Sequence, residues 1–518
     1  MSLARDVTTV GSATLVSRLL GFFRDIGIAA VLGAGVFSDA FFAVLQLTNF
    51  FRRMLAEGAL NSAFVPLWLR IKAAEGEAGA DRFLRGVLAT MIVACVVLAV
   101  IGLLFAPAVI DVLAPGFGGE RSALAADYLR IAAPYVVLAG TVAVLAAVLN
   151  AEGRVGAAAL GVIAFNAVLL LALAWIAAFG AALPSATGAM LAHAIVLAGI
   201  VQLMVTGAGF LRLRHTRVRL TFGFSADARR FFARAVPGLV AAGIPQLKLI
   251  AGAMVASSSP AAVSWLYYAN RLYELPLGVA SIAIAAVLVP AIAASVRNGA
   301  PEAVASAQSR GYEIGLGLAL PSAVAFAVLA EPIAGGLFER GAFGARDTAA
   351  VAAALAAICA GLPGHVLEKV LGAVSFAHED TRTPMWAALA GLAAALAGAL
   401  VLFPHFGHVG VAAAIAISGW VGATLLGATL AKRGWLRLDR DAWQRLPRII
   451  LATAMMGVAV LGAQALLASM LDMSGTPLAR IGALLVLIPI GLAVYLASLQ
   501  VLGVARLRDL IAAVRARL

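Results

Sequence analysis

Residues 87–105 read VLATMIVACVVLAVIGLLF, a run that contains no charged side chain. A stretch of about 20 such residues is long enough to cross the hydrocarbon core of a bilayer as a helix. Runs of this kind recur to the end of the chain, and we predict about fourteen membrane helices. They start near residues 7, 37, 84, 122, 155, 184, 230, 262, 303, 347, 383, 408, 447 and 478. The predicted fold class is an all-α polytopic membrane protein.

The composition supports this fold class. Hydrophobic residues make up 63% of the chain and charged residues only 12%, whereas a soluble domain carries about 25% charged residues. The formal net charge is +13, but the basic residues recur in clusters between apolar runs, so we expect no nucleic-acid partner. We predict no cleavable signal peptide, because Arg18 and Arg24 interrupt the first apolar run.

The positions of the basic clusters predict the topology. The clusters follow even-numbered helices, at residues 70–85, 212–234, 432–448 and 506–517. Loops after odd-numbered helices hold only scattered cations, such as Arg121 and Arg480. Because Lys and Arg concentrate in cytoplasmic loops, we predict an even number of helices with both termini in the cytoplasm.

The chain also contains a weak internal repeat. Ala63-Phe64-Val65-Pro66 resembles Val287-Leu288-Val289-Pro290, which lies 224 residues further on. Two more pairs of segments match at a similar offset, 106–117 with 331–343 and 134–150 with 363–379. Six helices per copy predict two parallel, pseudo-symmetric lobes around a central cavity, as in many transporters. We predict an N-terminal lobe at 1–220, a second lobe at 221–440 and a C-terminal helix pair at 441–518.

Sequence signatures of catalysis are missing. No Gly-Lys dipeptide occurs, so the chain has no ATP-binding P-loop. The six histidines are not at zinc-binding spacings. We interpret His193 and His365, and likewise Cys95 and Cys359, as packing or polar-satisfaction residues within apolar runs. We therefore predict a protein that is not an enzyme and that needs no metal or cofactor.

Charged residues inside the predicted membrane helices point to the function. A charge at mid-bilayer costs from about 3 to more than 10 kcal/mol, so such residues usually line a wet cavity. The candidate substrate-binding residues are Arg18, Arg24, Asp39, Asn49, Arg52, Arg53, Arg271, Glu274 and Lys369. Lys248 is a further cation, and whether Lys248 and Lys369 face the cavity is left open. Arginines in excess of matching carboxylates suggest a pathway for an anion.

Some of these charges also have a structural interpretation. Arg24 can pair with Asp25 or extend to the membrane interface. Arg18 and Arg24 are offset by about 120° around a helix, so both reach one anion only if the helix unwinds near Gly21 or the cavity is broad. Other cations have acidic neighbours that can neutralise them: Arg53 has Glu57 at i,i+4, Arg271 has Glu274 and Lys369 has Glu368.

Short motifs surround these charges. They are Ser17 through Asp25, Gly33-Ala34-Gly35, Asp39-Ala40-Phe41-Phe42, Asn49 through Ala59, Phe64-Val65-Pro66, Ala114-Pro115-Gly116-Phe117, Pro134-Tyr135 and Trp265 through Pro276. This pattern closely resembles the MurJ (MviN) family of lipid II flippases, which belongs to the multidrug/oligosaccharidyl-lipid/polysaccharide exporter superfamily. The resemblance covers nearly the whole chain. In one departure, this chain has Asn270 where some relatives carry Asp, so an acid at that position cannot be essential here.

The resemblance implies both a fold and an activity. It implies fourteen helices, with Arg18, Arg24, Arg52 and Arg271 lining a central cavity, Asp39 and Asn49 nearby, and a groove for a polyprenyl tail in the final helix pair. The implied activity moves undecaprenyl-pyrophosphate-linked disaccharide-pentapeptide from the cytoplasmic to the periplasmic face of the inner membrane. The implied partners are lipid II, membrane lipids and proteins of peptidoglycan synthesis and division. A coupling ion is left open.

Two alternatives also stay open. One is an exporter of another lipid-linked oligosaccharide or of a small molecule, from the same superfamily. Drug exporters of that kind have twelve helices and a carboxylate-rich cation site, which the arginines and the extra helix pair disfavour. The other is a non-transporting membrane scaffold for cell-wall enzymes, which would leave the costly intramembrane arginines unexplained.

Overall fold

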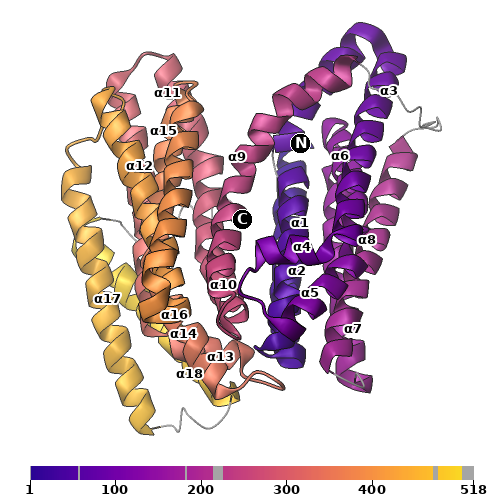
Figure 1. Ribbon diagram of the computed structural model, residues 1–518. Coiled ribbons are helices and arrows are strands. Elements are labelled where there is room, and N and C mark those ends of the chain that lie inside the picture. The colour runs from indigo at the N-terminus through magenta and orange to yellow at the C-terminus, as the bar shows by residue number, and fades with distance from the viewer. Residues whose placement is uncertain (1, 57–58, 181–183, 214–225, 471–476, 505–518) are drawn as a thin grey trace. The chain divides into compact units, whose positions relative to one another are not determined.

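The computed structural model describes residues 2–56, 59–180, 184–213, 226–470 and 477–504. Regular structure within these ranges is entirely helical (Figure 1), which confirms the predicted fold class. The chain divides into two compact units, Met1–Ser264 and Trp265–Leu518. Parts of two predicted basic clusters, at 214–225 and 506–517, lie outside the described residues.

The first unit contains nine complete helices in its described residues. They are α1 (Ser2–Leu32), α2 (Val36–Ala56), α3 (Ala59–Leu104), α4 (Ala106–Leu113), α5 (Gly119–Ala132), α6 (Tyr135–Ala151), α7 (Val155–Phe179), α8 (Pro184–Leu213) and α9 (Ala226–Ala256). The next helix, α10 (Ala262–Ala283), begins in this unit and continues into the second.

After α10, the second unit contains further helices, the last of which ends at Val501. They are a π-helical turn at Ile284–Leu288, α11 (Val289–Arg297), α12 (Pro301–Val328), α13 (Ala330–Phe338), α14 (Ala345–Cys359), α15 (Leu362–Ala377), α16 (Arg382–Lys432), α17 (Ala442–Met470) and α18 (Pro477–Val501). Helices begin at residues 36, 155, 184, 262, 301, 382 and 477, within two residues of predicted starts.

Two glycines break the longest helices into hairpins. A straight helix of 46 residues, the length of α3, would be about 70 Å long, more than twice the hydrocarbon thickness of a bilayer. Gly76 interrupts it with a φ of 67°, and Gly407 interrupts the 51-residue α16 with a φ of 55°. Glycine adopts this left-handed conformation without a Cβ clash, so each long helix is two antiparallel segments joined by a tight turn.

Positive-φ residues also recur at the spacing of the predicted repeat. Gly76 matches Gly299, Gly153 matches Glu379, and Gly180 matches Gly407, with separations of 223, 226 and 227 residues. These residues all end or interrupt helices, so corresponding turns occur at corresponding points of the chain. The backbone therefore supports a duplication that the sequence shows only weakly.

An aromatic cluster explains why α9 belongs to the first unit. Phe231 of α9 makes edge contacts with Phe64 and Phe83 of α3, each with ring centroids 5.9 Å apart. Trp68 stacks on Phe64 at 5.6 Å. The predicted lobe boundary near residue 220 rests on the repeat, whereas the compact units reflect packing of this kind. The predicted lobes therefore stay a prediction.

Eight helices in the described residues are long and apolar enough to cross a membrane, or nine if the bent pair α5–α6 is one span. The helices that carry Arg18, Arg52 and Arg271 are not among the eight, because charged and polar residues interrupt their apolar sequence. Leucine, valine and isoleucine are widely exposed, with Val458 of α17 72% exposed and Leu485 of α18 71% exposed. Such surfaces suit a lipid environment, and the count of fourteen stays a prediction.

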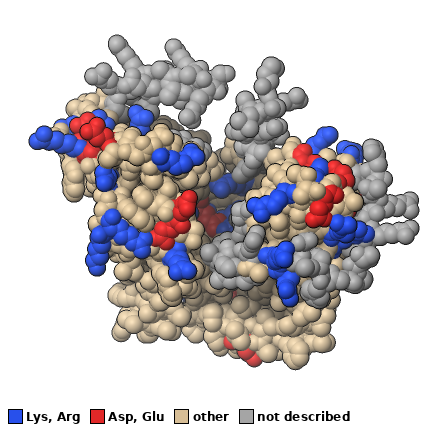
Figure 2. Space-filling view, turned by 90° about the horizontal axis from the view of Figure 1, so that it is seen from above, with Lys and Arg blue, Asp and Glu red and all other residues tan. Residues whose placement is uncertain are grey.

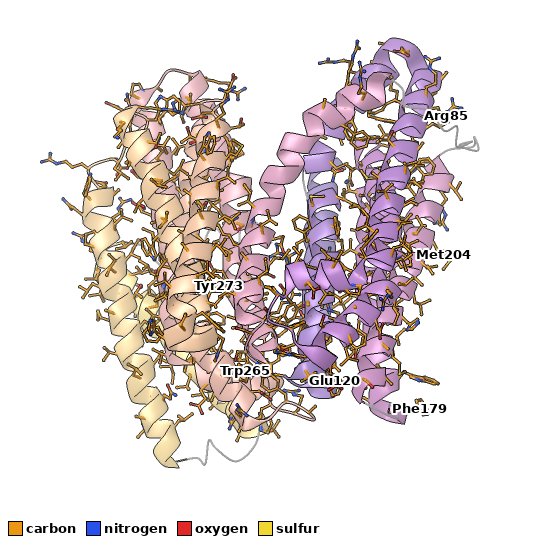
Figure 3. All side chains as sticks on the ribbon, viewed as in Figure 1. Arg85, Glu120, Phe179, Met204, Trp265 and Tyr273 are labelled. Carbon is orange, nitrogen blue, oxygen red and sulfur yellow. The ribbon has the colours of Figure 1, made fainter. Side chains whose placement is uncertain are left out.

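Exposed basic residues lie near the α3 bend of the first unit and near the loop before α12 of the second unit. Figure 2 shows Lys and Arg side chains on the face viewed, and Arg82 of the first unit and Arg297 and Arg310 of the second are exposed. Figure 3 places Arg85 near the α3 bend, and Glu120 and Phe179 at the opposite end of the first unit. These residues belong to the basic loops on which the predicted topology rests, and the topology stays a prediction.

Candidate substrate-binding site

Arg24 forms an ion pair inside the first unit. It is 6% exposed, and its Nε and Nη2 atoms donate to Asp25 Oδ1 at 3.0 and 2.7 Å. Its Nη1 atom donates to Asn166 Oδ1 of α7 at 3.2 Å. The predicted Arg24–Asp25 pair is therefore confirmed. Asn166 was not among the residues predicted from the sequence; it lies 142 residues from Arg24 and anchors α7 against α1.

Arg18 has a different environment on the same helix. It is exposed and makes no hydrogen bond or ion pair with the described residues. The helix α1 continues through Gly21 without interruption, so the unwinding considered from the sequence does not occur in this structure. Arg18 and Arg24 consequently lie on different faces, one exposed and one buried, as their angular offset predicts.

The cations of α2 are half-buried near its C-terminal end. Arg52 donates from Nε to the Asn49 side-chain oxygen at 3.4 Å, which is a contact with a neutral amide. Arg53 is also half-buried, and its predicted partner Glu57 lies outside the described residues. The structure thus brings Asn49 and Arg52 together, and it leaves the Arg53–Glu57 pair a prediction.

Asp39 is fully buried at the other end of α2. Its carboxylate accepts hydrogen bonds from the Ser264 hydroxyl at 2.6 Å, the Ser264 N–H at 2.9 Å and the Ala261 N–H at 2.8 Å. Arg121 of α5 forms a longer ion pair with it at 3.4 Å. In this conformation Asp39 therefore caps the start of α10 and ties α2, α5 and the α9–α10 loop together. A direct contact between Asp39 and substrate stays a prediction.

Loop 114–118 packs tightly against this cap. The Gly116 N–H donates to the Ser257 hydroxyl at 2.8 Å, and a Cβ at Gly116 would lie 2.2 Å from the Ser258 nitrogen. Only glycine permits this approach of two backbones. The guanidinium of Arg121 also lies 5.0 Å from the centre of the Phe117 ring. In the sequence Arg121 is one of the scattered loop cations, and no pattern there indicates this role.

The second unit carries the remaining candidates. Arg271 Nη1 and Glu274 Oε2 are 3.2 Å apart, and both side chains are about one-fifth exposed, so the predicted neutralising pair is present. Tyr273 lies between them in the sequence, and its hydroxyl is 2.8 Å from His365 Nδ1. Figure 3 labels Tyr273 and Trp265 on this part of the chain. His365 thus has the polar-satisfaction role predicted for it.

The two lysines differ in exposure. Lys369 of α15 is exposed, next to half-buried Glu368, whereas Lys248 of α9 is only 6% exposed. No group of three or more His, Cys, Asp or Glu residues in the described part of the chain is arranged to hold a metal ion. The candidate guanidinium groups of the first unit have amide neighbours and, at Arg24, a carboxylate, whereas Arg271 of the second unit is paired with Glu274. Guanidinium groups bind phosphate through paired N–H donors and keep their charge at any physiological pH.

Comparison with known proteins identifies the family. The family model described as lipid II flippase MurJ matches residues 28–478. The chain belongs to the MurJ family. A probable lipid II flippase MurJ of Rhizobium meliloti (strain 1021) is 38% identical over 515 residues, covering 98% of this chain and 95% of the relative. The family membership implied by the motifs around Arg18, Arg52 and Arg271 is confirmed.

Solved structures show that the MurJ fold extends over nearly the whole chain. A lipid II flippase MurJ in an inward closed conformation aligns with a TM-score of 0.80 at 23% identity, covering 97% of this chain and 99% of the other. An inward-facing multidrug transporter of the MATE family, in the MOP superfamily, aligns with a TM-score of 0.61 at 16% identity. It covers 80% of this chain and 94% of the transporter. The predicted superfamily fold is confirmed.

Proposed function

We propose that this chain is a lipid II flippase of the bacterial inner membrane. It would move undecaprenyl-pyrophosphate-linked disaccharide-pentapeptide from the cytoplasmic to the periplasmic face for peptidoglycan synthesis. Membership of the MurJ family carries the proposal. The arginines within otherwise apolar helices supply its chemistry, because a pyrophosphate in a membrane protein needs counter-charges away from bulk water.

The proposed binding groups differ in what each can do. Arg18 is exposed and makes no bond with the described residues, so it is the group that can bind pyrophosphate at once. Arg52 donates a long hydrogen bond to the neutral amide of Asn49, at 3.4 Å. Arg24 and Arg271 would have to exchange Asp25 and Glu274 for the substrate. Asp39 would act by positioning α10.

Transport would follow alternating access between two lobes, 1–220 and 221–440, as in other transporters built from repeats. The helix pair at 441–518 would hold the polyprenyl tail in a groove while the tail stays in the bilayer. The basic ends of both units would face the cytoplasm, with both termini there. Outward movement of an anionic headgroup down an inside-negative potential gains about 2.3 kcal/mol per charge per 100 mV, which can drive the cycle without ATP.

The test is lipid II exposure on the outer face of cells depleted of this protein, scored by cleavage with an externally added enzyme. Wild type should restore cleavage, and Arg18→Ala at equal abundance should not. Undiminished exposure in depleted cells that lack any other flippase would contradict the proposal. That result would favour the scaffold or another exported substrate.

A further inference from the structure

The hydroxyl of Tyr135 is buried without a partner. Tyr135 is the first residue of α6 and is 1% exposed, and its hydroxyl has no hydrogen-bond partner in the described part of the chain. Buried Tyr128 and Tyr495, by contrast, donate to backbone oxygens at 2.8 and 2.7 Å. A buried polar group without a partner destabilises a fold, and phenylalanine would fill the same space without this cost.

The ring of Tyr135 is fixed, so its hydroxyl cannot turn outward to a partner. Phe165 of α7 contacts the ring with centroids 5.5 Å apart. On α8, a Cβ at Gly199 would lie 2.7 Å from Tyr135 Cδ2, so that helix approaches the ring as closely as glycine allows. The N–H groups of Val136 and Val137 already bond Ala133 and Pro134, so the α5–α6 bend does not need the hydroxyl.

Two candidate arginines lie on helices of the same unit as Tyr135. The helix of Tyr135, α6, packs directly against α2, the helix of Arg52, and also against α7. Asn166 follows Phe165 in the chain and accepts from Arg24 Nη1 at 3.2 Å. The hydroxyl therefore lies in the part of the first unit where cations of α1 and α2 gather. A hydroxyl donor in the same helix bundle as two guanidinium groups is suited to an anion.

We propose that Tyr135 is a substrate-binding residue that donates a hydrogen bond to the pyrophosphate held by Arg52 and Arg24. The inference rests on the proposed function and adds a neutral donor to its cationic groups. The hydroxyl is buried in this structure. The hydrogen bond to the pyrophosphate therefore forms in a different conformation, in which the headgroup has reached these arginines. A bound water is the competing partner, and it predicts no effect of the hydroxyl on transport.

The experiment compares Tyr135→Phe with a matched control, Tyr312→Phe. Tyr312 of α12, in the second unit, is also buried with no partner for its hydroxyl among the described residues. The full-length proteins would be reconstituted with lipid II, and lipid II affinity, transport rate and thermal unfolding would be measured. Both variants should unfold at or above the wild-type temperature, since each removes an unsatisfied hydroxyl.

Only Tyr135→Phe should impair function. Loss of a hydrogen bond to a charged group should weaken lipid II binding or transport roughly 10- to 100-fold, while Tyr312→Phe should match wild type. Equal transport by both variants, or a lower unfolding temperature for Tyr135→Phe alone, would overturn the inference. The second result would mean that the hydroxyl has a structural partner.

Two further arms separate this inference from the proposed function. Undecaprenyl pyrophosphate should compete with lipid II less well in Tyr135→Phe than in wild type, whereas undecaprenol should compete equally in both. Arg52→Ala is measured in parallel. If Arg52→Ala fails to transport and Tyr135→Phe transports normally, only the role of Tyr135 is wrong. If Arg52→Ala also transports normally, the proposed cationic site is wrong.

Discussion

Asp39 accepts two hydrogen bonds from Ser264, one from the backbone N–H at 2.9 Å and one from the hydroxyl at 2.6 Å, although the residues are 225 positions apart. A third bond comes from the N–H of Ala261. The carboxylate thus satisfies donors at the N-terminus of α10, where the helix dipole also favours a negative charge. A residue of α2 thereby performs the task that an N-cap usually performs from within its own helix.

Asp39→Asn should destabilise the protein. The amide would present N–H groups to the donors of Ser264 and Ala261 and would remove the charge that faces Arg121, so we expect a loss of about 3 kcal/mol in the free energy of unfolding. Unfolding in a mixed-detergent titration measures this loss. Asp127→Asn is the control, since Asp127 pairs with Arg130 in an exposed position and its loss should cost less than about 1 kcal/mol. Equal losses would argue against the capping role.

Arg24→Ala should destabilise the protein more than Arg18→Ala. Removal of Arg24 takes two hydrogen bonds from the fully buried Asp25, which should cost about 3–5 kcal/mol. Removal of exposed Arg18 should change stability by less than about 0.5 kcal/mol. The double variant Arg24→Ala/Asp25→Ala should recover part of the loss, because no buried carboxylate is then left behind. If Arg24→Ala and Arg18→Ala were equally stable, the ion pair would contribute nothing.

Asp380 should make stability depend on pH in the acid range. It lies in the turn before α16, where burial acts to raise its pKa, but hydrogen bonds from Thr383, Arg433 and Arg382 prevail and lower the pKa from 3.8 to about 2. A lowered pKa stabilises the fold above pH 3.8, and the contribution is lost as the pH falls toward 2. Wild type should therefore unfold at a higher temperature than Asp380→Asn at pH 5. The difference should shrink between about pH 4 and 2, and a constant difference over that range would contradict this assignment.

Local contacts were predictable from the sequence, and distant ones were not. Helix starts followed from apolar runs, and the Arg24–Asp25 and Arg271–Glu274 pairs followed from neighbouring positions. Asn166 could not be found this way, because an amide in an apolar helix is typical of both packing and binding. The partners of Asp39 were likewise hidden, since helix packing brings them together.

The repeat is more visible in contacts than in residue types. Asp39 contacts Arg121 in the first unit, and Trp265 donates from Nε1 to Asp347 in the second. Both pairs are separated by 82 residues and join the start of one helix to the first turn of a later one. The acid lies on the earlier helix in one unit and on the later helix in the other. An alignment of residue types therefore does not detect the correspondence, although the same two positions are bonded.

The close packing of α15 against α16 makes the last prediction a comparison of two glycines in one helix. A Cβ at Gly364 would lie 2.8 Å from the Trp420 nitrogen and 2.9 Å from the Gly419 carbonyl carbon, whereas the nearest atom to a Cβ at Gly372 is the edge of the Phe376 ring at 3.8 Å. Backbone atoms of α16 cannot move aside alone, so Gly364→Ala should cost about 1–3 kcal/mol through overpacking.

Gly372→Ala should stabilise the protein instead, by about 0.5–1 kcal/mol, because alanine loses less conformational freedom in a helix and finds open space here. Both substitutions have the same intrinsic helix propensity, so the difference between them isolates the contact with α16. Unfolding of both variants in the same detergent mixture measures it. Equal stability would show that α16 shifts freely to admit a methyl group, and that this helix pair is not held by its small residues.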